Sequence, residues 1–460
     1  MSAIPVIAIF DIGKTNKKLF LLDEQYHILL ERNIQFHEIS DEDGDACEDV
    51  DLLSKWVVET FTEILRIENF DVVAINFSAY GASLVYIDDA GKVIAPLYNY
   101  LKKYPGKIKN ELYSKYGGAE KISCETASPV LGSLNSGMQL YRMMLEKPEL
   151  YQQIKYALHL PQFISWLITK KACSDITSIG SHTQLWNYRE NHYHQWVVSE
   201  GLDKKLAPIL ASDKTMEIVF ADKKLKAGTG LHDSSAALIP YLAVFTEPFV
   251  LLSTGTWCIS LNPFNNSPLT DEELKKDCLC YMEYQGKPIK ASRLFAGYEH
   301  EQQTKKIAEH FKKPVDFYKK IKYDASVIVN LQESNDFSSL NDEKNNGGAG
   351  QSDFDSRKLS RFKDHVEAYH CLMRDIIYQQ KIATQLVVRN TNVTRIFVDG
   401  GFSNNSIYMH LLAMMFPNLE VYAASVAQAT AMGAALAIHD DWNKFPKPAD
   451  MVKLKYYKVK

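Results

Sequence analysis

One pattern in this 460-residue chain limits its possible folds more than any other, and it occurs twice. An apolar run rich in β-branched residues leads into a turn of glycine, hydroxyl and other small residues, and a second apolar run follows. The first copy starts at Ile4–Phe10 and turns at residues 11–16; the second starts at Phe249–Ser253 and turns at residues 254–256. Such runs predict buried strands, and a small-residue loop after a strand is typical of a phosphate-binding backbone. We therefore expect two lobes of duplicated α/β architecture, each with a phosphate-binding turn.

The bulk properties are those of a globular protein with two domains. A chain of 460 residues exceeds one ordinary core, and we place the domains at residues 1–240 and 241–460. A net charge of −4 gives no reason to expect nucleic acid or an anionic membrane as a partner. No apolar run reaches about 18 residues, and the chain does not open with a signal-peptide pattern. Seven scattered cysteines, an odd number, indicate reduced thiols in a cytoplasmic protein.

Around the two turns, the sequence predicts alternating strands and helices. Helical spacing of apolar residues predicts helices at residues 52–65, 134–145, 161–169, 363–388 and 426–439. Apolar runs predict strands at residues 18–23, 26–32, 72–77, 84–87, 257–261 and 395–398. In this interpretation residues 110–200 are mostly helical, and residues 203–230 are a charged connection with few strands. Residues 335–356 are polar and glycine-rich and predict a mobile surface loop.

The first turn contains Gly13, Lys14 and Thr15, which resemble the end of a P-loop. A P-loop needs a glycine at the position of Ala8 and a helix after the lysine. Ala8 lies inside a predicted strand and another strand follows the turn, so we reject that assignment. Asp-x-Gly-x-Thr between two strands fits the phosphate grip of actin-like ATPases, in which Gly13 approaches phosphate, Thr15 donates a hydrogen bond and Asp11 faces Mg²⁺, usually through water. An ordinary hairpin turn is the alternative, because Asp-x-Gly suits one well.

Two later turns have similar chemistry. Ser253-Thr254-Gly255-Thr256 repeats the hydroxyl-rich glycine turn after a strand. Asp399-Gly400-Gly401 follows a predicted strand and precedes a helix that starts near Ser406. A Gly-Gly pair at the mouth of a helix lets a flat adenine lie against the backbone. A glycine-rich strand-to-helix turn without a ligand is also common, so this motif alone leaves both interpretations open.

An acidic residue stands near the middle of the chain, in Gly230-Leu231-His232-Asp233-Ser234-Ser235, at the start of a predicted helix, Ser234–Leu238. One hypothesis is that two domains close on a nucleotide and that Asp233 is the catalytic base in the cleft between them. The alternative is that Asp233 is the N-cap of the helix, whose carboxylate accepts from free backbone N–H groups. His232 could reach a substrate hydroxyl, or it could be a satisfied structural histidine.

Taken together, these motifs resemble the FGGY family of carbohydrate kinases over about residues 5–440. The strongest matches are Asp11–Lys18, Gly230–Ala236, Ser253–Trp257 and Asp399–Gly401, in the order of the family. The resemblance implies a two-domain actin-like ATPase (ribonuclease H-like) α/β fold with an interdomain cleft. It also implies ATP-dependent phosphorylation of a sugar with Mg²⁺ and Asp233 as general base, in a monomer or homodimer. The residues it assigns to nucleotide are Gly13, Thr15, Asn16, Lys18, Ser253, Thr254, Gly255, Thr256, Gly400, Gly401 and Asn404; those for sugar are Gly81, Ser83 and His232; Asp11 faces the metal.

Within the family, the chain looks closest to rhamnulokinase-like members. Trp257 directly after the second turn is similar to their phosphate loop, and residues 135–141, 159–163 and 183–185 resemble their sugar-binding region. This implies a 6-deoxyketohexose such as L-rhamnulose or L-fuculose. Ser83, Tyr100 and Gln428 stand where such kinases usually carry acidic residues. A kinase of another ketose or polyol, such as xylulose or glycerol, and a non-catalytic nucleotide- or sugar-binding sensor are the alternatives.

Overall fold

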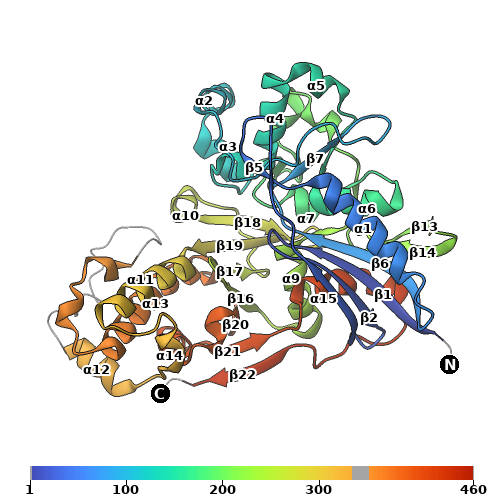
Figure 1. Cartoon of the computed structure of the whole chain (residues 1–460). Coiled ribbons are helices and arrows are strands. Elements are labelled where there is room, and N and C mark those ends of the chain that lie inside the picture. The colour runs from blue at the N-terminus through green and yellow to red at the C-terminus, as the bar shows by residue number, and fades with distance from the viewer. Residues whose placement is uncertain (1–2, 334–351, 459–460) are drawn as a thin grey trace. The chain divides into compact units, whose positions relative to one another are not determined.

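The computed structural model describes residues 3–333 and 352–458 (Figure 1). Contacts divide the chain into two compact units that are each discontinuous in sequence. The first unit comprises Met1–Phe245, Cys280–Pro288 and Ala427–Met451; the second comprises Thr246–Leu279, Ile289–Val426 and Val452–Lys460. The chain first passes from one unit to the other after Phe245, close to the boundary expected after residue 240. The sequence did not predict that residues 280–288 and 427–451 belong to the first unit.

In the described part of the chain, the main sheet of the first unit has seven strands. They are β1 (Ile4–Ile12), β2 (Lys17–Asp23), β3 (Ile28–Ile34), β6 (Phe70–Ala79), β13 (Met216–Phe220), β14 (Lys223–Ala227) and β15 (Leu231–His232). Their order is β13-β14-β6-β1-β2-β3, and β15 also pairs with β6. β1 runs antiparallel to β2 and parallel to β6. Val6–Phe10 are fully buried, as expected for the central apolar run, and the predicted strand–turn–strand opening is confirmed.

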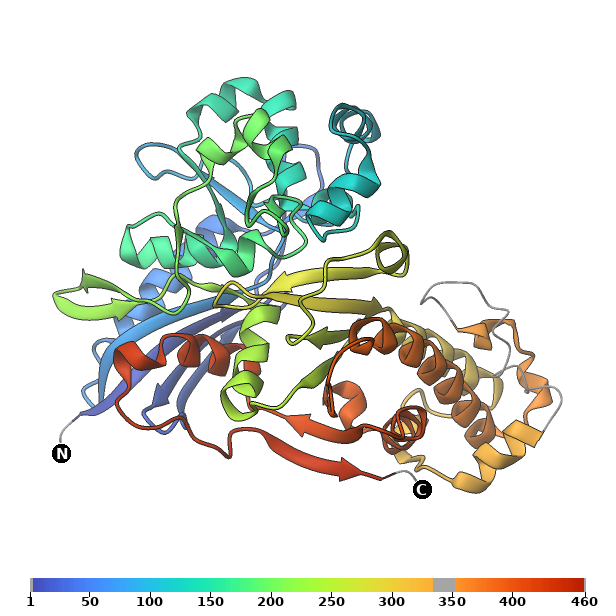
Figure 2. The ribbon, with the colours of Figure 1, turned by 180° about the vertical axis from the view of Figure 1, so that it is seen from behind.

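Helices cover both faces of this sheet. α1 (Val50–Ile64) and α6 (Leu160–Thr169) lie on one face, and α9 (Asp233–Val244) and α15 (Ala429–Ala437) lie on the other (Figures 1 and 2). α15 and α9 touch along their lengths because a glycine allows it: a Cβ on Gly433 would stand 1.8 Å from the carbonyl oxygen of Ala236. The helix that the sequence predicts at residues 426–439 is therefore present as α15, and the short helix α16 (His439–Trp442) follows it.

Residues 106–199 form the helical region that the sequence predicts, with short strands between the helices. The helices are α2 (Gly106–Lys115), α3 (Ala119–Glu125), α4 (Ser136–Glu146), α5 (Pro148–Gln153), α7 (Ile176–Ile179) and α8 (Gln195–Ser199). Minor strands of the first unit are β4 (Ile39–Ser40), β5 (Ala46–Cys47), β7 (Leu84–Ile87), β8 (Tyr156–His159), β9 (Ser174–Asp175), β10 (Trp186–Asn187), β11 (His192–Tyr193) and β12 (Ile209–Leu210). Trp186 and Trp196 are buried in a hydrophobic cluster that is separate from the core of the main sheet.

The prediction that residues 203–230 are poor in strands is wrong. β13 and β14 form a hairpin around Ala221 and Asp222, both at positive φ (46° and 65°), and β14 joins the main sheet beside β6. Ile218, Leu225 and Ala227 are buried on the inward face, with Met216 and Phe220 partly buried beside them. The outward face carries Glu217, Val219, Lys224 and Lys226. The charged residues of the exposed face obscure the alternation of apolar and polar residues by which a half-buried strand is otherwise recognised.

The second unit repeats the order of the first. Its strands are β16 (Phe249–Thr254), β17 (Cys258–Asn262), β18 (Cys278–Met282, which continues into the first unit), β19 (Pro288–Leu294), β20 (Arg395–Gly400), β21 (Glu420–Ser425) and β22 (Lys453–Tyr457). The described sheet has the order β18-β19-β17-β16-β20-β21-β22. β16 runs antiparallel to β17 and parallel to β20, as β1 does to β2 and β6. The predicted duplication is confirmed.

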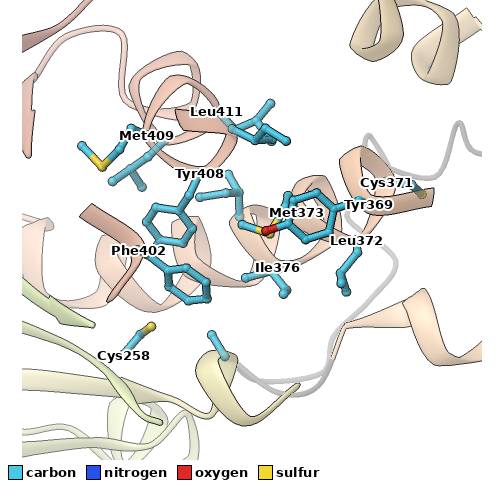
Figure 3. Packing of buried hydrophobic residues seen from close by; sticks show 14 of the residues in the cluster. Cys258, Tyr369, Cys371, Leu372, Met373, Ile376, Phe402, Tyr408, Met409 and Leu411 are labelled. Carbon is cyan, nitrogen blue, oxygen red and sulfur yellow. The ribbon is translucent and has the colours of Figure 1, made fainter. Parts of the chain in front are cut away.

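Five helices of the described second unit complete it. They are α10 (Asp271–Lys275), α11 (Ala296–His310), α12 (Ala325–Glu333), α13 (His365–Val388) and α14 (Ser406–Met415). α11, α13 and α14 pack on one another, and their apolar faces form the core in Figure 3, where Phe402 stacks on Tyr408. Asp364 and Asn405 cap α13 and α14 by accepting from backbone N–H groups of the first turn.

Two expectations from the sequence concern the surface loop at residues 335–356 and membrane-spanning helices. Residues 335–351 of the predicted surface loop lie outside the described residues, and Asp353–Ser356 form a short 3₁₀ helix. In the described chain, helices that combine the length and apolarity needed to cross a bilayer are not found.

Candidate active site

Three parallel strand ends bring the predicted catalytic residues of the first unit together. β6 pairs in parallel with β1 on one side and with β15 on the other. Ser78 of β6 is in register with Asp11 and also with Leu231. Carboxyl ends of neighbouring parallel strands meet at one edge of a sheet, which is where open α/β sheets bind ligands. Asp11, the loop after β6 and Asp233, the residue after β15, therefore share one edge.

Asp233 is desolvated and yet reachable. It is the first residue of α9, and its Oδ1 accepts from the backbone N–H of Ser234 at 2.6 Å and from the Ser234 hydroxyl at 3.3 Å. Its side chain keeps 34% of its area exposed. Desolvation raises the pKa of Asp233 to about 6, although both Ser234 contacts oppose the shift. A carboxylate with this pKa can accept a proton near neutral pH.

The alternative that Asp233 is the N-cap does not describe its place. The N-cap is His232, whose side chain makes no capping bond, and Asp233 stands one position inside the helix. Its carboxylate accepts from the backbone N–H of its immediate neighbour, whereas a capping carboxylate serves the N2 and N3 donors further along the first turn. The position is still favourable for a negative charge, because the helix N-terminus carries partial positive charge.

Asp11 is the second carboxylate at this edge. Its Oδ2 accepts a 2.6 Å hydrogen bond from the Thr430 hydroxyl of the neighbouring α15 segment. Burial raises the pKa of Asp11 to about 6, the charge of Asp233 adds to the shift, and Thr430 and Lys18 oppose it. Groups of three or more His, Cys, Asp or Glu side chains able to cage a metal are absent from the described residues. Two repelling carboxylates without a cage fit a hydrated Mg²⁺, which keeps several of its waters.

The first glycine turn links β1 and β2. The N–H of Gly13 donates to the carbonyl of Asn16 at 2.9 Å, and Thr15 is exposed. A strand, and not a helix, follows Lys14, so rejecting a P-loop is confirmed. Lys18 donates from Nζ to Oε1 of Gln428 at 3.2 Å. The Gly13 N–H is therefore engaged within the turn, and the exposed Thr15 offers its hydroxyl, so the turn is not a lysine-centred cradle.

The three residues predicted to bind the sugar, Gly81, Ser83 and His232, have different surroundings. A Cβ on Gly81 would stand 2.4 Å from the His232 ring, so Gly81 and His232 pack face to face. His232 is buried, its pKa is lowered to about 4 by desolvation, and its Nε2 lies 3.6 Å from Oδ1 of Asp233. The rings of His182 and Tyr281 flank it at 5.6 and 5.8 Å. Ser83 is buried, with 1% exposure.

Next to Ser83, a buried ionic group occupies the loop after β6. The Tyr80 hydroxyl donates to Glu48 at 3.0 Å, and Glu48 forms an ion pair with the fully buried Lys17. Tyr100, where the related kinases usually have an acidic residue, packs edge-on against Tyr80 with ring centroids 6.1 Å apart. Sequence motifs did not single out Glu48, because its role depends on a strand that is distant in sequence.

In the second unit, the two predicted nucleotide turns interlock. The Thr254 hydroxyl donates to the Asp399 carbonyl at 2.6 Å and accepts from the Phe402 N–H at 3.0 Å. Gly400 has φ of +89°, and a Cβ there would stand 2.0 Å from the carbonyl oxygen of Thr254. Only glycine fits such a position. Gly255 and Gly401, in contrast, face open space, because a Cβ added to either would have no described atom closer than 3.8 Å.

These turns line a pocket of about 750 Å³ that belongs to the second unit alone. Of the predicted nucleotide residues of this unit, Thr254, Gly255, Thr256, Gly401 and Asn404 line it. Ser253 and Gly400 do not, although Gly400 packs against Thr254. Its size falls in the range of small-molecule sites, roughly 300–1,000 Å³. Open space at Gly255 and Gly401 lets a ligand approach the backbone, although the Gly255 N–H itself donates to the Trp257 carbonyl at 2.9 Å. Small-residue turns of this kind suit a phosphate.

Several residues of this pocket were not predicted as site residues, among them Gly297, His300, Tyr318 and Asn405. A Cβ on Gly297 would stand 1.8 Å from the carbonyl oxygen of Gly255, so α11 begins in direct contact with the second turn. A glycine at the start of an amphipathic segment was the available signal. His300, Tyr318 and Asn405 come together only through the fold.

Comparison with known proteins agrees with this arrangement. Residues 6–238 match the model of the FGGY family of carbohydrate kinases, N-terminal domain, and residues 246–332 match the carbohydrate kinase FGGY C-terminal domain. A rhamnulokinase of Halalkalibacterium halodurans is 22% identical over 266 residues, which are 54% of each protein, so the chain spans about half the length of this curated relative.

Solved structures match over nearly the whole chain. A carbohydrate kinase from Novosphingobium aromaticivorans superposes with a TM-score of 0.79 at 22% identity, covering 99% of this chain and 95% of that one. A ligand-bound xylulose kinase from Lactobacillus acidophilus has a TM-score of 0.77 at 17% identity, covering 99% and 94%. At these identities the likeness establishes the fold, the two-domain α/β fold expected from the sequence.

Proposed function

This chain belongs to the FGGY family of carbohydrate kinases, and we propose that it transfers the γ-phosphoryl group of ATP to a hydroxyl of a 6-deoxyketohexose such as L-rhamnulose or L-fuculose. Asp233 is the general base of this proposal. The observation that supports it most directly is the pair of desolvated carboxylates at one sheet edge, of which Asp233 is reachable and has a pKa near 6.

In this mechanism Asp233 accepts the proton of the attacking hydroxyl. Phosphoryl transfer needs little covalent help from the protein, and positioning and charge neutralisation dominate. The open backbone at Gly255 and Gly401 and the Thr256 hydroxyl are assigned to the phosphate oxygens, since the Thr254 hydroxyl already donates to Asp399. The turn of Gly13 and Thr15 is assigned the same work in the first unit. Mg²⁺, when bound through water at Asp11, supplies positive charge against the phosphate oxygens.

The sugar assignment draws on different observations. The rhamnulokinase relative supports a 6-deoxyketohexose, and the buried, neutral His232 gives the base a neighbour that can exchange a hydrogen bond with a second substrate hydroxyl. Gly81 leaves space for that ring, and Ser83 belongs to the same loop. The likeness to a xylulose kinase favours a second candidate, a kinase of another ketose such as xylulose.

A coupled assay of ATP consumption over a panel of ketoses and polyols tests the proposal. L-Rhamnulose or L-fuculose is expected to give the highest kcat/KM. A preference for xylulose or glycerol would overturn the sugar assignment and keep the kinase. Binding of ATP and of a sugar without turnover of any panel member would overturn the kinase and leave the sensor alternative.

A further inference from the structure

His300 is held rigidly at the wall of the second-unit pocket. It lies on α11, lines the pocket and is 8% exposed. Three aromatic rings meet the imidazole edge to face: Tyr318 at 4.8 Å, Phe402 at 5.3 Å and Tyr369 at 5.7 Å between ring centroids. Figure 3 shows Phe402 and Tyr369 as members of the same packed core. The ring therefore has one orientation.

A chain of hydrogen bonds that leads to this ring has a defined direction. Oδ1 of Asn405 accepts from the backbone N–H groups of Ile407 and Tyr408 at 3.0 and 3.2 Å, because Asn405 caps α14. These two bonds fix which end of the amide is oxygen. Nδ2 of Asn405 is therefore the donor in its 2.6 Å hydrogen bond to the Tyr369 hydroxyl.

The tautomer of His300 follows from this direction. Tyr369 is fully buried and burial raises the pKa of its phenol, so the hydroxyl keeps its proton. That proton goes to Nε2 of His300, 2.9 Å away. Burial also lowers the pKa of His300 to about 4, so the ring is neutral. A neutral imidazole that accepts at Nε2 carries its proton at Nδ1.

The Nδ1–H group has no protein acceptor among the residues that the structure describes. The pocket around it is divided by chemistry. Gly255 leaves the backbone open to approach and Thr256 adds a hydroxyl, whereas Tyr318, Ile321 and Phe402 offer apolar surface. A neutral donor fixed among aromatic rings suits a neutral acceptor on a flat ring or a sugar, and a phosphate is better served by the turns.

We propose that His300 is a specificity-determining residue of the nucleotide pocket, and that its Nδ1–H donates to an acceptor of the nucleoside part, either a ring nitrogen of the base or a ribose oxygen. This inference rests on the proposed function, because it takes the pocket to hold ATP. Tyr369 is a positioning residue, which acts by holding the proton of His300 on the side that faces the ligand.

Calorimetry with ATP and with inorganic tripolyphosphate tests the proposal on the full chain. His300→Leu is expected to bind ATP about three- to tenfold more weakly, the range for one neutral hydrogen bond, and to bind tripolyphosphate as the wild type does. His300→Gln, which keeps an N–H donor, is expected to recover part of the loss. Equal ATP affinity in wild type and His300→Leu would overturn the role of His300, whereas no ATP binding by the wild type would overturn the proposed function instead.

Two further measurements locate the acceptor and the proton. If the acceptor is a base nitrogen, one of the 1-, 3- or 7-deaza analogues of ATP loses affinity for wild type but not for His300→Leu; if it is on ribose, 2′- or 3′-deoxy-ATP does so. If every analogue lowered the affinity of wild type and of His300→Leu by the same factor, the proposed contact would be excluded. ¹⁵N NMR is expected to show His300 as the neutral Nδ1–H tautomer at pH 6–8, and Tyr369→Phe to release the Nε2–H tautomer. If His300 of the wild type were instead the Nε2–H tautomer, the proposed direction of the Asn405–Tyr369–His300 hydrogen bonds would be wrong.

Discussion

The carboxylate of Asp233 combines desolvation with access, and both matter for the effect of removing its charge. Asp233→Asn keeps the size of the side chain but cannot accept the substrate proton. We predict that kcat falls by about 10²- to 10⁴-fold, the usual contribution of a general base. ATP affinity is unchanged, because the pocket of the second unit contains no part of Asp233. Steady-state kinetics and calorimetry on the purified variant measure both quantities.

A matched control is the same exchange at Asp222, an exposed residue of the β13–β14 turn with φ of +65°. Asparagine tolerates that conformation, so Asp222→Asn should leave kcat unchanged. Near-normal turnover in Asp233→Asn would remove Asp233 from the chemistry and return it to a purely structural role.

The pH dependence follows from the same carboxylate. The base must be ionised, and the pKa of Asp233 is raised to about 6, so kcat/KM should rise with pH through about 6 and level off above it. Asp11 titrates in the same range, which makes the rising limb report on the pair. A profile that is flat from pH 5 to 8 would be inconsistent with a desolvated base.

Stability should change in the opposite direction. A carboxyl whose folded-state pKa is raised stabilises the fold at low pH, and this contribution is lost as pH rises through about 6. Asp233→Asn lacks the titration, so its Tm relative to wild type should increase between pH 5 and pH 8. Thermal melts across that interval measure the difference, and a variant that loses Tm as the pH rises would contradict the assigned shift.

At this scale, much of the candidate site could be located from sequence. Asp11 and Asp233 follow apolar runs, and strand ends are where such residues gather. Thr430, Glu48 and His300 could not be located in this way, because each acts on a partner that only the tertiary fold brings near. Their own neighbours in sequence carry no periodicity or motif that marks them.

At the scale of elements, Gly255 of the second turn and Gly297 of α11 meet at one contact and are needed for different reasons. A Cβ on Gly255 meets nothing within 3.8 Å, so Gly255→Val should fold with an unchanged Tm. Its branched side chain would stand where phosphate approaches the backbone. We predict that ATP binds at least about tenfold more weakly, a loss of about 1.4 kcal/mol. Calorimetry showing wild-type ATP affinity in the folded variant would exclude the turn as a phosphate site.

Gly297→Ala is the structural counterpart. Its Cβ would stand 1.8 Å from the Gly255 carbonyl oxygen, and overpacking of this kind costs about 1–3 kcal/mol. The alanine variant should therefore lose Tm as well as ATP affinity, whereas Gly255→Val loses affinity alone.

The contact between α9 and α15 gives a second prediction at this scale. Gly433→Ala would force the two helices apart, because a Cβ would stand 1.8 Å from the Ala236 carbonyl oxygen. We predict a loss of about 1–3 kcal/mol in unfolding free energy. We also predict lower kcat, because α9 begins with Asp233 and the α15 segment carries Thr430, the partner of Asp11. Chemical denaturation and kinetics measure the two effects.

Gly106→Ala is the control for that variant. Gly106 is the first residue of α2, and a Cβ there would meet nothing within 4 Å. Alanine is a better helix former than glycine, so this variant should be as stable as the wild type or slightly more so. Equal stability of Gly433→Ala and wild type would show that the two helices have room to spare.

Most elements could be predicted because their patterns are local. α13 and the strands β1 and β16 carry apolar residues at the spacing of their own structure. The β13–β14 hairpin escaped because Lys and Glu cover its outward face, and charged residues at every second position look like a solvated connection. In that segment Ile218, Leu225 and Ala227 are the fully buried residues of the inward face.

At the scale of the whole chain, the duplicated sheets were predictable and the discontinuous units were not. Two strand–loop–strand openings predict two similar sheets. That α15 packs on β1 and β6 depends on contacts between segments several hundred residues apart, and no local pattern encodes them. The Asn76 amide, for example, donates to the Ala434 carbonyl at 2.8 Å.

A fragment ending at residue 245 should therefore fail to fold cooperatively. It lacks α15, which covers the face of β1 that contains Ile7 and Ile9, both fully buried in the whole chain. We expect binding of a hydrophobic dye and a broad thermal transition. Fusing residues 427–451 to this fragment through a flexible linker should sharpen the transition. Cooperative melting of the shorter fragment would show that α15 is dispensable.

Because residues 427–451 belong to the first unit but are synthesised last, the order of synthesis affects how this unit folds in the cell. Ribosomes add about 5–20 residues per second, so the roughly 200 residues between Phe245 and Met451 delay the arrival of α15 by about 10–40 s. During this time the nascent first unit presents an uncovered apolar sheet face to the surrounding solution. A prematurely terminated product ending before residue 429 contains Asp11, Asp233 and every glycine turn, yet it has the exposed surface that chaperones and proteases recognise. We therefore expect products that end before α15 to be degraded faster than the whole chain, because only α15 completes the cover of this sheet face.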